Sequence, residues 1–236
     1  MGKTQINDDP LDFAYSHAIV AASGPSLSED QVQLIRHMKM ETDEFLLIAI
    51  NDTYKLFADV LDIVYCADLS WLKMNESGLK EKTTAAKIVM PDRPNIRDYT
   101  SSSVEQLNLV TCHNYQGLHR DPGSINCGRN SGFQALHLAR NLGAKEIILV
   151  GFDMSVDPES GKEHWFGSHP NGLRSPAAEF SSFIEHFIPL ASDLRAEGTT
   201  VWNCTGPNSK LNGIFPSTFL ESAFIRWELQ RRREKK

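Results

Sequence analysis

Small polar and acidic side chains follow four short apolar segments that have the length and composition of buried strands. Ser23, Gly24, Pro25 and Ser26 follow the first of these segments, and Asn51, Asp68 and Asp153 follow the other three. Because the carboxyl ends of parallel strands meet at one edge of a sheet, we expect these residues to lie close together. Any one of them is equally well explained as a turn residue or helix cap. Their convergence predicts a site that binds a ribose or a base.

A glycine-flanked polar turn, Gly128-Arg-Asn-Ser-Gly132, opens a predicted helix that ends at Gly143. Free backbone N–H groups at a helix N-terminus attract phosphate. Ser131 and Gly132 are therefore candidate phosphate ligands, with Ser131 also the expected N-cap, and Arg129 can neutralise phosphate charge. The turn has neither the Gly-Lys-Ser/Thr of a Walker A loop nor G-x-G-x-x-G spacing, which removes the main support for a P-loop kinase or a nicotinamide enzyme.

A long polar segment, residues 155–176, is predicted to form a lid over this site. It carries His164 and His169, and imidazole titrates near neutrality, so either can act as a general base. Their i, i+5 spacing without a clear third ligand does not match a zinc site, and we expect no metal site. Trp165 between them is expected either to stack on a base or to anchor the loop.

Apolar segments alternate with amphipathic ones along the chain, which positions these candidate residues at strand ends. Strands are expected at 17–23, 45–50, 62–67, 87–90 (stopped by Pro91), 107–112 (at a sheet edge), 147–150 and 199–203. Helices are expected at 28–38, 53–59, 70–77, 131–143, 177–197 (interrupted or kinked at Pro189) and 219–233. This alternation predicts an α/β fold with a single Rossmann-like, doubly wound, mainly parallel sheet.

We expect a lead-in at 1–17, a nucleotide-binding α/β domain at 18–215 with its lid at 155–176, and a basic C-terminal helix at 216–236. Residues 226–236 carry six basic and two acidic side chains, whereas the whole chain of 236 residues has a net charge of −6. The acidic remainder argues against a broad nucleic-acid surface. The basic tail is expected to be a solvated helix end or a contact with a membrane surface or anionic polymer.

The composition is that of an ordinary globular protein, with 41% hydrophobic and 23% charged residues. No apolar run approaches the roughly 18 residues of a membrane span. The four cysteines have no C-x-x-C spacing and are expected to be buried free thiols in a reducing cytosol. A cytoplasmic location is therefore expected, and homo-oligomerisation is compatible with the sequence.

An ordered set of short motifs resembles a known family. The motifs are Ala21–Leu27, Asn51, Ser131-Gly132, Leu142-Gly143, Glu146–Asp153, His164–His169 and Pro207-Asn208-Ser209. Their order, from about Ala18 to Phe215, is similar to that in the metal-independent, single-domain bacterial sialyltransferases. The chain also resembles uncharacterised, often prophage-encoded proteins of that fold and the related archaeal 6-hydroxymethylpterin pyrophosphokinase-like proteins. The resemblance is strongest to the prophage-encoded group, through Gly-Arg-Asn-Ser-Gly and His-Trp-Phe-Gly-Ser-His-Pro.

The resemblance implies roles for individual residues. Ser23, Asn51 and Ser131 would contact the nucleotide, Asp68 would lie near the donor, and Asn208 and Ser209 would lie near the nucleobase. His169, or else His164, would take the proton of the acceptor hydroxyl. The sialyltransferases also have two tyrosines after the strand that ends in Gly-x-Asp, but this chain has no tyrosine after Tyr115. Arg129, Lys162 or Arg174 would then stabilise the leaving phosphate.

Three functions follow from these observations. The first is metal-independent transfer of a sugar from a nucleotide donor, CMP-linked by the resemblance, to a hydroxyl acceptor, with no covalently bound cofactor. The second is a pyrophosphokinase-like reaction with ATP, in which Asp68 and Asp153 would hold Mg²⁺. The third is a non-catalytic nucleotide-binding module of a phage or virion; a prophage protein would act in the host cytoplasm. The missing tyrosines leave the transferred group open.

Overall fold

One eight-stranded sheet forms the centre of the computed structural model, which describes residues 15–82, 86–97, 99, 107–113, 116–168 and 177–234. The strand order is β6-β5-β4-β3-β2-β1-β7-β8, and all seven neighbouring pairs are parallel. The strands are β1 (His17–Ala21), β2 (Leu46–Ile50), β3 (Ile63–Tyr65), β4 (Lys87–Asp92), β5 (Leu107–His113), β6 (Ser124–Asn126), β7 (Glu146–Val150) and β8 (Thr200–Asn203). The predicted Rossmann-like, doubly wound α/β fold is confirmed.

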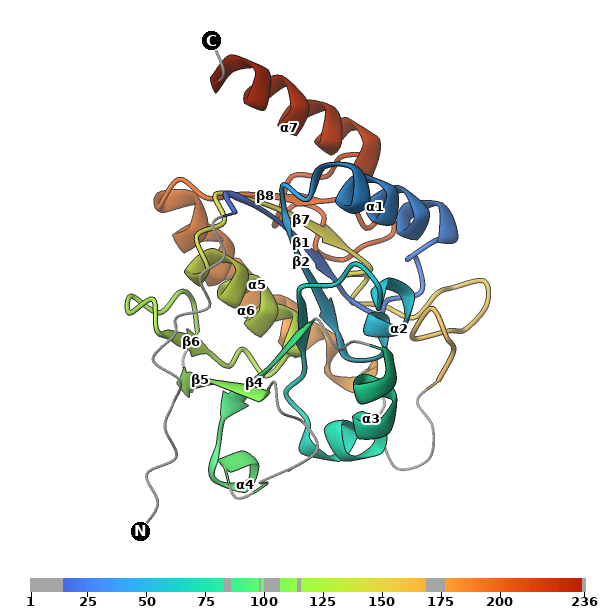
Figure 1. Ribbon diagram of the computed structural model, residues 1–236, viewed down its shortest axis with the longest axis vertical. Helices are drawn as coiled ribbons and strands as arrows, with labels where there is room; N and C mark the ends of the chain where they lie inside the picture. Colours follow the sequence, from blue (N-terminus) through green and yellow to red (C-terminus); the bar gives the residue numbers. More distant parts are fainter. Residues whose placement is uncertain are drawn as a thin grey trace.

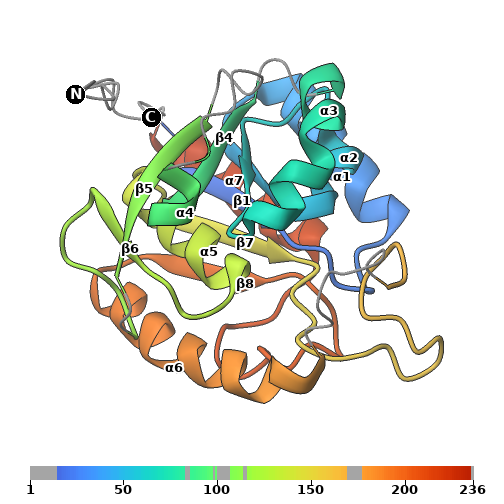
Figure 2. The same ribbon diagram turned by 90° about the horizontal axis from the view of Figure 1, so that it is seen from below.

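Helices cover both faces of the sheet, as Figure 1 and Figure 2 show. The helical segments are α1 (Glu29–Thr42), η1 (Asn51–Thr53), α2 (Tyr54–Phe57), α3 (Leu69–Lys82), α4 (Pro94–Arg97), α5 (Ser131–Asn141), η2 (Ala177–Glu179), α6 (Phe180–Ala196) and α7 (Leu220–Glu234). Side chains of α1, α2, α3 and α7 share one apolar core with one face of the sheet. Those of α5 and α6 share the second core with the other face.

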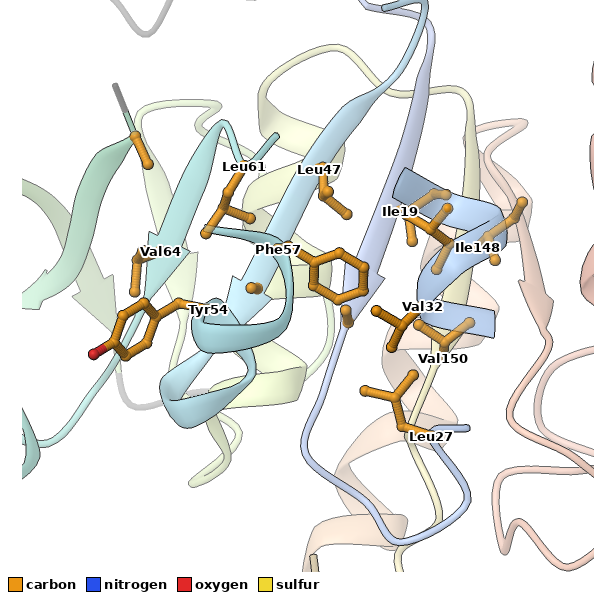
Figure 3. Close-up of a cluster of buried hydrophobic side chains, with 14 of the residues drawn as sticks. Ile19, Leu27, Val32, Leu47, Tyr54, Phe57, Leu61, Val64, Ile148 and Val150 are labelled. Carbon is orange, nitrogen blue, oxygen red and sulfur yellow. The ribbon is translucent and has the colours of Figure 1, made fainter. Parts of the chain in front are cut away.

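The first of these cores explains why the central strands are apolar throughout. Figure 3 shows Ile19 of β1 and Leu47 of the neighbouring β2 beside Val32 of α1 and Phe57 of α2. Successive residues of a strand point to opposite faces, so the neighbouring Ala18 belongs to the second core. Strands that are buried on both faces therefore need apolar residues at every position.

The chain reverses its direction of winding at β1, and this reversal determines where a ligand can bind. From β1 the chain winds through β2 to β6, and α5 then carries it back to β7 on the other side of β1. The loops after β1 and β7 therefore leave the sheet side by side, and the backbone N–H of Gly24 donates to the carbonyl of Gly151 at 2.9 Å. Crevices at such switch points are the usual ligand sites of open α/β sheets.

The prediction that Pro91 stops this strand is wrong. Pro91 lies buried within β4 and pairs with Val110 of β5. The pairing of β3 with β4 ends at Val89, so β3 has no residue opposite position 91 that could accept a hydrogen bond. The missing N–H of Pro91 therefore breaks no hydrogen bond to β3. The prediction that 107–112 is an edge strand is also wrong. The three-residue β6, which was not predicted, pairs outside β5 and forms the edge.

The C-terminal helices belong to the same body as the sheet. Helix α6 continues through Pro189 without the predicted interruption. Helix α7 buries Leu220, Ala223 and Phe224 in the first core and leaves its basic residues Arg226 and Arg232 exposed. Within the described ranges, every helix is too short or too polar to cross a bilayer.

Candidate functional site

A cavity of about 340 Å³ lies at the carboxyl ends of β1, β2 and β7, beside the start of α5. This is the switch point of the sheet, and the volume suits a small-molecule ligand. The structure brings most of the residues predicted from the sequence to its wall. They are Ser23, Gly24, Asn51, Asp68, Arg129, Ser131, Gly132, Asp153 and His164.

Asp153 is the most desolvated carboxylate of this wall. Its side chain is only 5% exposed. Ser26 binds it through its hydroxyl, 2.8 Å from Oδ2, and through its backbone N–H at 3.4 Å. Burial raises the pKa of Asp153 from 3.8 to about 6, because these two hydrogen bonds only partly replace water. Asp153 therefore changes charge close to neutral pH.

The first turn of α5 presents unused hydrogen-bond donors to the cavity. Asn130, and not Ser131 as predicted, is the N-cap, because its side chain accepts from the N–H of Phe133 at 3.1 Å. Within the described residues, the backbone N–H groups of Ser131 and Gly132 have no acceptor. These two groups and the helix dipole are available to bind phosphate.

Replacing Asn130 by Ala should therefore loosen this turn. Loss of the cap should lower the free energy of unfolding by about 1 kcal/mol, since the N–H of Phe133 loses its acceptor. Urea denaturation measures the change. Asn95→Ala at an exposed position of α4 is the matched control, and equal stability of the two variants would contradict the capping role.

A buried polar network holds the same turn from behind, and the sequence analysis missed it. The hydroxyl of Tyr65 donates to Oε1 of Gln134 at 2.7 Å, and Nε2 of Gln134 donates to the carbonyl of Cys127 at 2.6 Å. Burial raises the pKa of Tyr65 well above its usual value, so the phenol stays a donor. The available signal was a glutamine on the apolar side of the predicted helix.

Asn51 follows β2 in a left-handed conformation, with φ of 49°. Its Oδ1 atom is buried and has no hydrogen-bond partner among the described residues. A buried amide oxygen of this kind calls for an N–H or O–H donor, which a ligand in the cavity can supply. The neighbouring Asp52 is occupied within the protein, because it accepts from the indole N–H of Trp71 at 2.7 Å and pairs with Lys55.

The beginning of the predicted lid is attached to the end of β1. Nδ1 of His164 lies 3.0 Å from the hydroxyl of Ser23, and the N–H of Trp165 donates to the carbonyl of Ser23 at 3.0 Å. Trp165 packs against the first core and does not line the cavity, so of the two expected roles it has the anchoring one. His164 is thereby fixed at the cavity wall.

Asp68 and Arg129 reach the cavity wall while already bound to other groups. Asp68 caps α3, since its Oδ1 accepts from the N–H of Ser70 at 2.7 Å. Arg129 forms an ion pair with Glu179 at 3.2 Å. A phosphate would have to compete with that carboxylate for the guanidinium.

The remaining predicted residues lie elsewhere. Ser209 is buried and donates to the carbonyl of Phe152 at 2.7 Å, and Asn208 is exposed. Lys162 is exposed in a turn and is not part of the cavity wall, and neither is Pro25. His169 and Arg174 lie outside the described residues.

Four acidic residues line the cavity: Asp68, Asp153, Glu163 and Glu179. The described residues contain no group of three or more His, Cys, Asp or Glu side chains arranged to hold a metal ion. Mg²⁺ commonly binds through one or two carboxylates and the phosphates of a substrate, keeping waters as its other ligands. An ion that arrives with a nucleotide would therefore need only one or two of the carboxylates on this wall.

The expectation of four free thiols is wrong for one pair. Cys112 and Cys127 form a disulfide, with their Cα atoms 5.9 Å apart, whereas Cys66 and Cys204 are buried free thiols. The pairing of β5 with β6 brings together two cysteines that are 15 residues apart in the chain. This proximity depends on the short strand β6, which the sequence did not reveal.

The fold and the site define an α/β protein of Rossmann-like type with a polar ligand cavity at the switch point of its sheet. The model of the family described as 6-hydroxymethylpterin diphosphokinase MptE-like matches residues 3–159, and the chain belongs to this family. The match contains every strand-end residue of the cavity from Ser23 to Asp153, but not His164. Comparison with individual curated proteins found no match.

The family match supports one of the three predicted resemblances, that to the pterin pyrophosphokinase-like proteins. It gives no support to the similarity with sialyltransferases or with prophage-encoded proteins. Among the predicted functions, it favours the pyrophosphokinase-like reaction over sugar transfer.

Proposed function

We propose that the protein binds a nucleoside triphosphate, with ATP the first candidate, together with Mg²⁺, and transfers a diphosphate group to a hydroxyl of a small acceptor. The observation that carries this proposal is the cavity in which carboxylates, Asp68 and Asp153 among them, share one wall with the polar turn at the start of α5. Membership of a diphosphokinase-like family agrees with it.

In this reaction the acceptor oxygen attacks the β-phosphorus of the triphosphate. The bond from that phosphorus to the oxygen bridging it to the α-phosphate breaks, and the nucleoside monophosphate leaves. The N–H groups of Ser131 and Gly132 would bind phosphate oxygens and stabilise the charge that develops on them. Mg²⁺ held by Asp68 and Asp153 would supply further charge neutralisation.

The proton of the acceptor hydroxyl needs a base. We assign this role to His164, because its ring lies at the cavity wall and the Ser23 hydroxyl, 3.0 Å from Nδ1, fixes its orientation. The role of His169 as the base stays a prediction, because this residue lies outside the described ranges. Asn51 would accept a hydrogen bond from the nucleotide or the acceptor through its buried Oδ1.

Sugar transfer from a nucleotide donor is the second candidate. The position of His164 beside the cavity favours it equally, since a base that activates a hydroxyl serves either reaction. The two candidates differ in their need for a metal ion.

Thermal unfolding with nucleotides tests the proposal. ATP should raise the melting temperature only when Mg²⁺ is present, because binding to the folded state stabilises it by mass action. CMP, UDP and ATP with excess chelator are the comparison samples, and released AMP reports turnover with a hydroxyl acceptor. Stabilisation by CMP in chelator would favour sugar transfer. The absence of any nucleotide effect would refute both candidates.

A further inference from the structure

Arg93 lies directly after the last residue of β4, next to the phosphate-binding turn. Its side chain is half-buried, and Nη2 lies 3.7 Å from Sγ of Cys127. Cys127 immediately precedes Gly128, the first residue of the turn, and its carbonyl accepts from the N–H of Asn130 at 3.4 Å. Cys127 lies two residues before Arg129, the first residue of this turn on the cavity wall, and Arg93 itself is not part of that wall.

Arg93 differs from most other arginines in having no carboxylate partner among the described residues. Six arginines of the described chain form ion pairs with Asp or Glu: Arg36, Arg97, Arg129, Arg140, Arg231 and Arg232. The other arginines whose side chains the structure describes, Arg120, Arg195 and Arg226, have no such partner and are exposed to water. Among these side chains Arg93 alone is both partly buried and unpaired.

Within the part of the chain that the structure describes, no carboxylate forms an ion pair with Arg93. The adjacent carboxylate of Asp92 is bound by Arg97. Sulfur is a weak acceptor, so the contact with Cys127 replaces little of the hydration that burial removes. A partly desolvated cation without a counter-charge is costly, and an anionic ligand would remove that cost.

We propose that Arg93 binds the distal phosphate of the diphosphate that is transferred. This inference rests on the proposed function and names a residue for the far end of its substrate. In the sheet, β4 lies on the β6 side of β1, whereas Asp153 follows β7 on the opposite side. The turn of α5 would hold the nearer phosphates, and the guanidinium of Arg93 would hold the terminal one through paired N–H groups.

Isothermal titration of the full chain with inorganic pyrophosphate, AMP and ATP, each with Mg²⁺, tests this role. Arg93→Gln should weaken pyrophosphate and ATP binding at least about tenfold and leave AMP binding unchanged, since AMP has no distal phosphate. Arg93→Lys keeps the charge without the planar fork and should fall between wild type and Arg93→Gln. If Arg93→Gln does not fold, Arg93→Lys alone tests whether the guanidinium binds the distal phosphate.

Arg195→Gln is the matched control, because it removes the same charge from an exposed arginine of α6 that forms no ion pair within the described residues. It should leave pyrophosphate binding within about twofold of wild type. Equal losses in the two Gln variants, or equal losses of AMP and pyrophosphate in Arg93→Gln, would overturn the role of Arg93. Unchanged pyrophosphate binding in Arg93→Gln would also overturn it. A wild-type protein that binds neither ATP nor pyrophosphate would refute the proposed function itself.

Discussion

Replacing Asp153 by Asn should stabilise the protein at pH 8 while weakening its binding of Mg²⁺ and ATP. Burial raises the pKa of this carboxyl from 3.8 to about 6, so the folded protein holds the proton more tightly than the unfolded chain. Between pH 4 and 6 the unfolded chain releases the proton first, and the free energy of unfolding falls as the pH rises. At pH 8 the ionised side chain costs on the order of 3 kcal/mol.

The amide that Asp153→Asn introduces is neutral at every pH and can still accept from the hydroxyl of Ser26 through its oxygen. The variant should therefore exceed wild type by about 1–3 kcal/mol at pH 8, and the two should converge near pH 4. Urea denaturation at both pH values measures this difference. Titration with ATP and Mg²⁺ should show a loss of affinity of about 10–100-fold, as expected when a carboxylate of a metal site is removed.

Asp157 provides the control for the stability measurement. It is partly exposed, and hydrogen bonds from the N–H and hydroxyl of Ser160 hold its pKa below the usual value, so its ionised form favours folding. Asp157→Asn should give no gain at pH 8. Equal stability of wild type and Asp153→Asn at pH 8 would show that ionised Asp153 carries no desolvation cost.

Replacing Gly24 by Ala should disrupt the crevice between β1 and β7. A Cβ atom at this position would lie 2.9 Å from Cγ of Asp153, and nearer still to its Oδ2 and to the carbonyl oxygen of Gly151. The backbone cannot simply yield, because the N–H of Gly24 is bonded to that same carbonyl. We expect a loss of about 3 kcal/mol in the free energy of unfolding, together with loss of nucleotide binding.

Gly123→Ala is the matched control for this substitution. There the nearest atom to an added Cβ, Oδ1 of Asp121, is 3.4 Å away, which is an ordinary contact. Its stability should stay within about 0.5 kcal/mol of wild type. If Gly24→Ala were as stable as Gly123→Ala in urea denaturation, the loops after β1 and β7 would not be in the close contact described above.

The fold and part of the site could be predicted because they depend on local patterns. Apolar runs such as 45–50 indicate strands buried on both faces, and Ser28 with Gln31 forms the predicted capping box at the start of α1. Parallel strands bring their carboxyl ends to one edge, so Ser23, Asn51 and Asp153 could be grouped without coordinates.

Other features depended on contacts between distant segments. The family resemblance places Asn208 and Ser209 near a nucleobase, but the Ser209 hydroxyl donates to the carbonyl of Phe152 in the loop after β7. Arg129 is a candidate phosphate ligand in the sequence, but in the structure it pairs with Glu179, 50 residues later in the chain. No local pattern could indicate these partners, because side chains far apart in the sequence compete for the same polar group.

The sequence by itself determined the class of fold, the edge of the sheet where the cavity lies and the turn beside it, since each follows from hydrophobic periodicity and local backbone chemistry. Only the tertiary structure decided which polar groups are left over for a ligand. The desolvation of Asp153, the unpartnered Oδ1 of Asn51 and the unpaired charge of Arg93 arise from packing between segments that are remote in the chain. Burial and partner choice are properties of the assembled fold, so the site's chemistry emerges only when the strands are in place.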